Sequence, residues 1–263
     1  MIGAIAGDVI GSVYEWHPTK SKRFELLRAD CFFTDDTVMT IACAQVLLGQ
    51  GAYAERYRTL GRRYPNAGYG GRFAHWLWSD DAGPYNSWGN GSAMRVSPVG
   101  FACNTVDQVM SEAARSAEVT HNHPEGVKGA QATALAIYMA RTGSSKDDIR
   151  RAITQRFRYD LERTVAQILP TYRFDESCQG TVPEAIICFL EATGYEDAIR
   201  NAISLGGDAD TLACITGGIA QAFYGVPDDI VAFTRSRLPQ EFLDTIDAFD
   251  AAFKGSADSP ANH

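Results

Sequence analysis

Several patterns that mark common protein classes are missing from this sequence. No apolar run approaches the roughly 20 residues that a membrane-spanning helix needs, and the apolar residues 1–8 lack a basic leader. We therefore expect a soluble protein without a signal peptide. No C-x-x-C pair occurs, and several cysteines lie in apolar helical stretches, which predicts reduced, buried thiols and a cytoplasmic location. The six cysteines are Cys31, Cys43, Cys103, Cys178, Cys188 and Cys214.

Positive charge is also scarce. The chain has 24 Lys and Arg residues against 32 Asp and Glu residues, a formal net charge of −8. Proteins that bind along a nucleic-acid phosphate backbone usually carry a basic face, so the net negative charge argues against nucleic acid as a partner. Neither a G-x-G-x-x-G nor a Walker A sequence is present, which argues against Rossmann and P-loop folds.

Alternating strand patterns are few, and helical periodicity dominates. Apolar residues three and four positions apart predict helices over residues 37–48, 106–120, 126–141, 147–157, 161–169, 183–193, 195–204, 210–224 and 239–253. Gly3, Gly7 and Gly11 predict an N-terminal helix packed closely against a neighbour. No linker and no internal repeat occurs. We expect an all-α, compact, single-domain orthogonal helical bundle over residues 1–253 and a disordered polar tail at residues 254–263.

Two short acidic motifs, residues 34–37 (Thr-Asp-Asp-Thr) and 206–211 (Gly-Gly-Asp-Ala-Asp-Thr), each precede an apolar helical segment. Mg²⁺ and Mn²⁺ prefer oxygen-only ligand sets of this kind, whereas a helix cap needs a single oxygen. For either motif alone, capping and metal binding are equally good explanations. Together the motifs favour a metal site, because four carboxylates that meet in space require a cation or bound protons.

Residues 86–95 form a third unusual segment, rich in glycine and small polar residues. Glycines permit close backbone approach, so that N–H groups can cradle a phosphate, and Trp88 offers a flat surface. A plain connecting loop has the same composition, so both interpretations stay open at this point.

Taken in order, these motifs resemble those of the ADP-ribosylglycohydrolase family. The similar segments are residues 7–12 with Glu15, then residues 33–37, 89–95, 120–123 and 206–211. The resemblance covers about residues 3–225, and it implies the family's all-α fold, in agreement with the helical periodicity.

The resemblance implies two Mg²⁺ or Mn²⁺ ions and hydrolysis of the bond between C1″ of ADP-ribose and an acceptor, with ADP-ribose as product. Two metals would chelate ribose hydroxyls and lower the pKa of a bound water. Glu15, which matches a mobile family glutamate, is the first candidate for proton transfer and Asp36 the second; residues 16–31 would be the flap that carries Glu15. The implied metal ligands are Thr34, Asp35, Asp36, Asp208, Asp210 and Thr211.

The resemblance also implies a set of residues that contact the diphosphate and the distal ribose. For His121, satisfying the carbonyls of a helix C-terminus is an equally good interpretation. For Arg95 we favour a structural role over phosphate binding, because it follows Met94 into an apolar turn. The implied substrate-binding residues are Gly70, Gly71, Ser87, Trp88, Gly89, Asn90, Gly91 and His121.

Two other functions stay open. The acidic motifs would also suit a metal-dependent phosphoester hydrolase, which would release AMP or phosphate, and a non-catalytic ADP-ribose binder would show affinity without turnover. The acceptor is open as well: an ADP-ribosylated protein side chain such as arginine or serine, a small molecule, or a nucleobase, the one case in which nucleic acid would be a partner. Acceptor contacts are expected on variable loops such as residues 69–85.

Overall fold

The computed structural model describes residues 1–253, and these form helices joined by loops. Within that range there is no strand, only an isolated antiparallel bridge between Gly89 and Ser177. The all-α prediction is therefore confirmed, while the predicted tail, residues 254–263, lies outside the described residues. The helices are α1 (Ile2–Glu15), α2 (Asp35–Leu47), α3 (Tyr53–Arg63), α4 (Gly71–Trp78), α5 (Gly91–Met94), α6 (Ser97–Ala102), α7 (Val106–Glu118), α8 (Pro124–Arg141), α9 (Lys146–Phe157), α10 (Val165–Ile168), α11 (Cys178–Glu191), α12 (Tyr195–Ser204), α13 (Ala209–Tyr224), α14 (Asp228–Arg235) and α15 (Gln240–Phe253).

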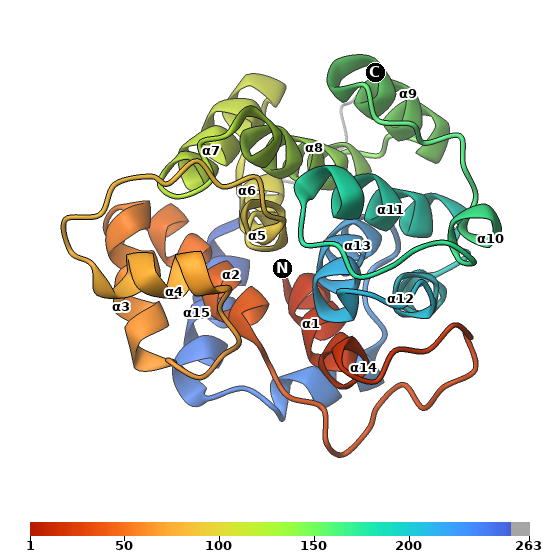
Figure 1. Cartoon of the computed structure of the whole chain (residues 1–263), viewed down its shortest axis with the longest axis horizontal. Helices are drawn as coiled ribbons and strands as arrows, with labels where there is room; N and C mark the ends of the chain where they lie inside the picture. Colours follow the sequence, from red (N-terminus) through yellow and green to blue (C-terminus); the bar gives the residue numbers. More distant parts are fainter. Residues whose placement is uncertain (254–263) are drawn as a thin grey trace.

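Helix α13 runs through the middle of the molecule, and α1, α8, α11 and α12 pack around it (Figure 1). All residues from Ala209 to Ala220 are buried. The closest neighbour is α1, as the glycine spacing predicts: a Cβ at Gly7 would lie 2.0 Å from the carbonyl oxygen of Ala213, and one at Gly11 would lie 2.5 Å from Cα of Asp210. Only glycine permits this approach. It brings the end of α1 next to the start of α13.

A second group of helices surrounds α2, which packs against α3, α6 and α15, and a third surrounds α8, which packs against α6, α7 and α9. This packing places the N-termini of α2 and α13 near α5, at the centre of the view in Figure 1. No helix in residues 1–253 is both long enough and apolar enough to cross a bilayer.

Helical periodicity located most elements within about two residues, but it failed at two of them. The helix predicted over residues 161–169 is only the short α10, because Arg158 adopts a left-handed conformation (φ 61°) and Thr164 caps a new start. Helix α11 begins at Cys178 rather than at Pro183, with the Ser177 hydroxyl accepting a hydrogen bond from the amide N–H of Gly180.

Helices α3, α4, α5, α6 and α14 have no counterpart among the predicted segments. In α3 the buried face is formed by Tyr53, Tyr57, Leu60 and Gly61, while most of its other residues are charged or polar. The segment is regular but strongly polar overall, and it therefore lacks the high apolar and Ala content that marked α8 and α13 in the sequence.

Candidate active site

A cavity of about 480 Å³ lies where the ends of α1, α2, α5 and α13 converge. Every residue proposed for the site from the sequence lines this cavity except Trp88, which is 46% exposed and packs beside His123. The proposed residues on its wall are Glu15, Thr34, Asp35, Asp36, Gly70, Gly71, Ser87, Gly89, Asn90, Gly91, His121, Asp208, Asp210 and Thr211. Segments that are far apart in the chain thus meet at one place.

The first acidic motif is held by a residue that the site prediction omitted, Asp8 of α1. Its fully buried carboxylate accepts hydrogen bonds from the amide N–H and the hydroxyl of Thr34, at 3.0 and 2.6 Å, and from the same two groups of Thr37, the amide at 3.1 Å. These groups form the first turn of α2, where free N–H groups favour a negative charge. A single aspartate in an otherwise apolar helix was the sequence signal for this contact.

The second acidic motif begins with two glycines whose backbone conformations other residues rarely adopt, Gly206 at φ 58° and Gly207 at φ 150°. This turn places Asp208 just before α13. The side-chain amide of Asn90 donates a hydrogen bond to Asp208 Oδ2 at 2.7 Å and another to Thr181 Oγ1 at 3.1 Å. Asn90 therefore orients a proposed metal ligand, and its predicted contact with substrate stays a prediction.

The two acidic motifs touch each other through Thr211, whose hydroxyl donates to Asp36 Oδ2 at 3.3 Å. The other carboxylate oxygen, Asp36 Oδ1, is buried and has no hydrogen-bond partner. Burial and then the neighbouring carboxylates raise the pKa values of Asp35, Asp36 and Asp210 well above the ordinary value. No lysine or arginine of residues 1–253 forms an ion pair with these groups. The cluster therefore requires bound protons or a cation.

These residues fit a hard divalent cation by their chemistry. The donors are carboxylate and hydroxyl oxygens, the set that Mg²⁺ and Mn²⁺ prefer, and an orphaned buried oxygen such as Asp36 Oδ1 is a free ligand position. The side chains are not arranged in advance, because residues 1–253 contain no group of three Asp, Glu, His or Cys side chains already gathered around one point. A cation would have to draw them together.

Glu15 ends α1 at the edge of the cavity and is half-buried. Burial, followed by the negative charges of Asp208 and Asp8, raises the pKa of Glu15 to about 7. A carboxyl group with a pKa in this range exchanges protons readily near neutral pH. The neighbouring Trp16 is 74% exposed and lines the same cavity.

The segment after Glu15 is anchored to the rest of the molecule. The ammonium group of Lys20 donates to the carbonyl oxygens of Leu169 at 3.2 Å, of Tyr172 at 2.9 Å and of Leu205. Leu205 directly precedes Gly206, so Lys20 connects this segment to the turn that positions Asp208.

The cavity is also lined by two arginines and a histidine, Arg72, Arg95 and His121. Arg95 has the structural role that we favoured: it is fully buried, and its Nη2 donates to the carbonyl oxygen of Ser116 at 2.9 Å and to Thr120 Oγ1 at 2.8 Å. Its guanidinium group also lies 4.3 Å from the ring centre of Tyr57. The side chain of His121 bonds to a hydroxyl group, Thr120 Oγ1, rather than to helix carbonyls.

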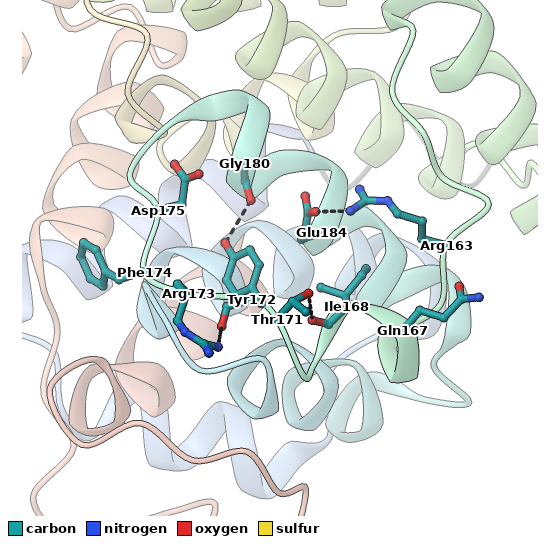
Figure 2. Close-up of a pocket in the computed structure, with 10 residues that line it drawn as sticks. All are labelled: Arg163, Gln167, Ile168, Thr171, Tyr172, Arg173, Phe174, Asp175, Gly180 and Glu184. Atoms are coloured by element: carbon teal, nitrogen blue, oxygen red, sulfur yellow. Dashed lines mark hydrogen bonds and ion pairs between the residues drawn. The ribbon is translucent and has the colours of Figure 1, made fainter.

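A second cavity, of about 360 Å³, lies between α10 and α11 (Figure 2). Its polar groups are largely paired with one another: Arg163 forms an ion pair with Glu184, and the Tyr172 hydroxyl donates to the carbonyl oxygen of Gly180. None of the proposed site residues lines it. The larger cavity is therefore the candidate active site.

Comparisons with known proteins identify the family and the fold. The model of the family described as ADP-ribosylglycohydrolase matches residues 1–258. The chain is 28% identical to ADP-ribosylhydrolase ARH3 of Mus musculus, over 86% of this chain and 83% of that protein. It is 26% identical to ADP-ribosylarginine hydrolase Tri1 of Pseudomonas putida, over 97% and 80%. A solved structure, called an ADP-ribosylglycohydrolase-related protein complex, shares the fold, with a TM-score of 0.73, 24% identity and 97% of both chains covered.

Proposed function

The chain belongs to the ADP-ribosylglycohydrolase family, and from this premise we propose that it hydrolyses the bond between C1″ of ADP-ribose and an acceptor, releasing ADP-ribose. One observation carries the proposal: carboxylates from two remote motifs line a single cavity, and Arg72, Arg95 and His121 line the same cavity. A ligand that has both ribose hydroxyls and a diphosphate matches this combination of carboxylates with guanidinium and imidazole groups. Similarity to ARH3 and Tri1 supports the same activity.

We further propose that Thr34, Asp35, Asp36, Asp208, Asp210 and Thr211 hold two Mg²⁺ or Mn²⁺ ions. Bound metal would fix the ribose hydroxyls and lower the pKa of a water molecule. The orphaned Asp36 Oδ1 and the raised pKa values of Asp35, Asp36 and Asp210, which a bound cation would lower, support this assignment.

In the proposed reaction, a water oxygen bonds to C1″ while the bond from C1″ to the acceptor breaks, and the acceptor keeps the electron pair. The surrounding carboxylates stabilise the cation-like sugar. Glu15 accepts the water proton and passes it to the departing acceptor, and its pKa of about 7 suits both transfers. Asp36, the second candidate, is buried and already accepts a hydrogen bond from Thr211, so Glu15 is the better placed of the two.

The acceptor would lie at the mouth of the cavity, beside the exposed rings of Trp16 and Phe32. Substrates ADP-ribosylated on arginine and on serine, each offered to the purified protein with Mg²⁺ or Mn²⁺ and with chelator, test the proposal when the product is identified by mass. Metal-dependent release of ADP-ribose is expected from at least one of them. Release of AMP or phosphate would favour the phosphoester hydrolase, and affinity for ADP-ribose without turnover would favour the binder.

An Asp208→Ala variant is expected to lose activity and metal affinity, because Asp208 belongs to the acidic wall and is oriented by Asn90. Asp228→Ala, at the first turn of α14 and away from the cavity, is the matched control. Full turnover by Asp208→Ala in chelator would refute the two-metal proposal. The cytoplasmic location remains a proposal that the six unpaired cysteines support.

A further inference from the structure

A row of hydrogen bonds connects the buried Arg95 to the wall of the cavity. Arg95 Nη2 donates to Thr120 Oγ1 at 2.8 Å, and Thr120 Oγ1 lies 2.7 Å from Nδ1 of His121. The exposed fractions of the three residues are 0%, 0% and 4%, so water does not compete for these bonds. Because a guanidinium group can only donate, Thr120 Oγ1 is the acceptor in its bond with Arg95.

The Thr120 hydroxyl has one hydrogen of its own to donate. Within residues 1–253, the partners of Thr120 Oγ1 are Arg95 Nη2 and His121 Nδ1, and only Nδ1 can accept. A hydroxyl that donates to Nδ1 requires Nδ1 to be unprotonated. The neutral imidazole ring then carries its hydrogen on Nε2.

Nε2 faces the glycine-rich loop on the cavity wall. A Cβ placed at Gly91 would lie 3.1 Å from His121 Nε2, and one at Gly89 would lie 3.5 Å from it. His121, Gly89 and Gly91 all line the cavity, and Nε2 makes no hydrogen bond to any residue of the part that the structure describes. The Nε2–H group is therefore a donor that no protein group uses.

We propose that Arg95 and Thr120 are positioning residues that hold His121 as the Nε2–H tautomer, ready to donate a hydrogen bond to a phosphate oxygen of ADP-ribose. This inference rests on the proposed function. Burial, followed by the charges of Arg95 and Arg72, keeps the pKa of His121 well below its ordinary value, in agreement with a neutral ring. A neutral donor contributes a directed bond without the desolvation cost of a further buried cation.

The tautomer can be read directly from the ¹⁵N shifts of histidine-labelled protein, with the His121 signals assigned by their loss in His121→Gln. We expect an unprotonated Nδ1 and a protonated Nε2 at His121 in the ligand-free wild type. A protonated Nδ1 would overturn the inference whatever the protein binds.

The contribution of the hydrogen bonds from Arg95 through Thr120 to His121 is measured with two variants. Thr120→Val keeps the side-chain volume and removes the hydroxyl, whereas Thr120→Ser retains the hydroxyl. Losing one oriented hydrogen bond should raise the Kd for ADP-ribose, measured by calorimetry, about tenfold in Thr120→Val and leave it near wild type in Thr120→Ser. In turnover, KM should rise while kcat changes little, because this contact is present in both ground and transition states.

Thr133→Val is the matched control, since Thr133 is equally buried and its hydroxyl has no hydrogen-bond partner. A purely structural role would lower the Tm of Thr120→Val but leave its tautomer and its affinity for ADP-ribose unchanged, and that result would refute the inference. If Thr120→Val does not fold, the ¹⁵N shifts of His121 in the wild type and the affinity of Thr120→Ser for ADP-ribose decide whether the inference holds. If the wild type binds no ADP-ribose, the proposed function is wrong, and the nitrogen shifts still decide the tautomer.

Discussion

Replacing Asp8 by alanine should destabilise the protein strongly although Asp8 is not itself a proposed metal ligand. The substitution leaves two amide N–H groups and two hydroxyls of Thr34 and Thr37 without their acceptor. An unsatisfied buried donor costs about 1–3 kcal/mol, and the hydroxyls can rotate to other partners. The substitution also removes the repulsion of Asp8 with Asp35 and Asp36, since Asp8 helps to raise their pKa values, and this offsets part of the loss in stability. We expect a net loss of about 3 kcal/mol.

Urea unfolding in chelator measures the loss in free energy of unfolding, and thermal unfolding in the same buffer measures the Tm. Chelator ensures that metal binding does not contribute to either. At about 2–4 °C per kcal/mol for a chain of this size, the Tm should fall by about 6–12 °C. Activity with added Mg²⁺ should fall at least about tenfold, because the first turn of α2 is displaced. Asp107→Ala, in the first turn of α7 and exposed, is the control and should cost less than about 1 kcal/mol. An Asp8→Ala variant within about 1 kcal/mol of wild type would refute this account of the motif.

Three further predictions follow from the same packing and charges. Gly7→Ala should cost about 3 kcal/mol or more in urea unfolding, since its Cβ would overlap α13, whereas Gly194→Ala, with open space around it, should change little. In chelator, the Tm should be lower at about pH 8 than at about pH 5.5. The raised pKa values of Glu15 and the buried carboxylates mean that the native state holds more protons than the unfolded state, so the native state loses stability as pH rises. Added Mg²⁺ should reverse this loss. A flat profile would contradict the clustering. Gly91→Ala should weaken ADP-ribose binding about tenfold with little change in Tm, because its Cβ would crowd His121 Nε2, and unchanged affinity by calorimetry would argue against a ligand there.

Two predictions from local sequence were accurate because a short-range pattern determines them. Long runs of apolar and small residues located α2, α8 and α13 closely, since a helix that is apolar nearly all round must be buried in the core. The glycines of α1 predicted a close helix contact, because absence of a side chain is useful only where another backbone approaches. Where the helix is strongly polar overall, as in α3, the same reasoning found nothing.

The hydrogen-bond partners could not have been predicted in this way. Asp8 with Thr34, Asn90 with Asp208, and Thr211 with Asp36 are pairs separated by 26, 118 and 175 residues. A side chain such as Asn90 carries no local sign of whether it will meet a ligand or another side chain, because both require the same donors and acceptors.

The sequence by itself determined the helical fold class, the family and the inventory of oxygen ligands, because these depend on periodicity and on residue type within a few neighbouring positions. The tertiary structure alone decided that the two acidic motifs share one cavity and that Arg95 lines the same cavity. It also decided that the pKa of Glu15 is raised to about 7. Burial and Coulomb interactions depend on distances through space, and only the close contact of α1 with α13 sets those distances.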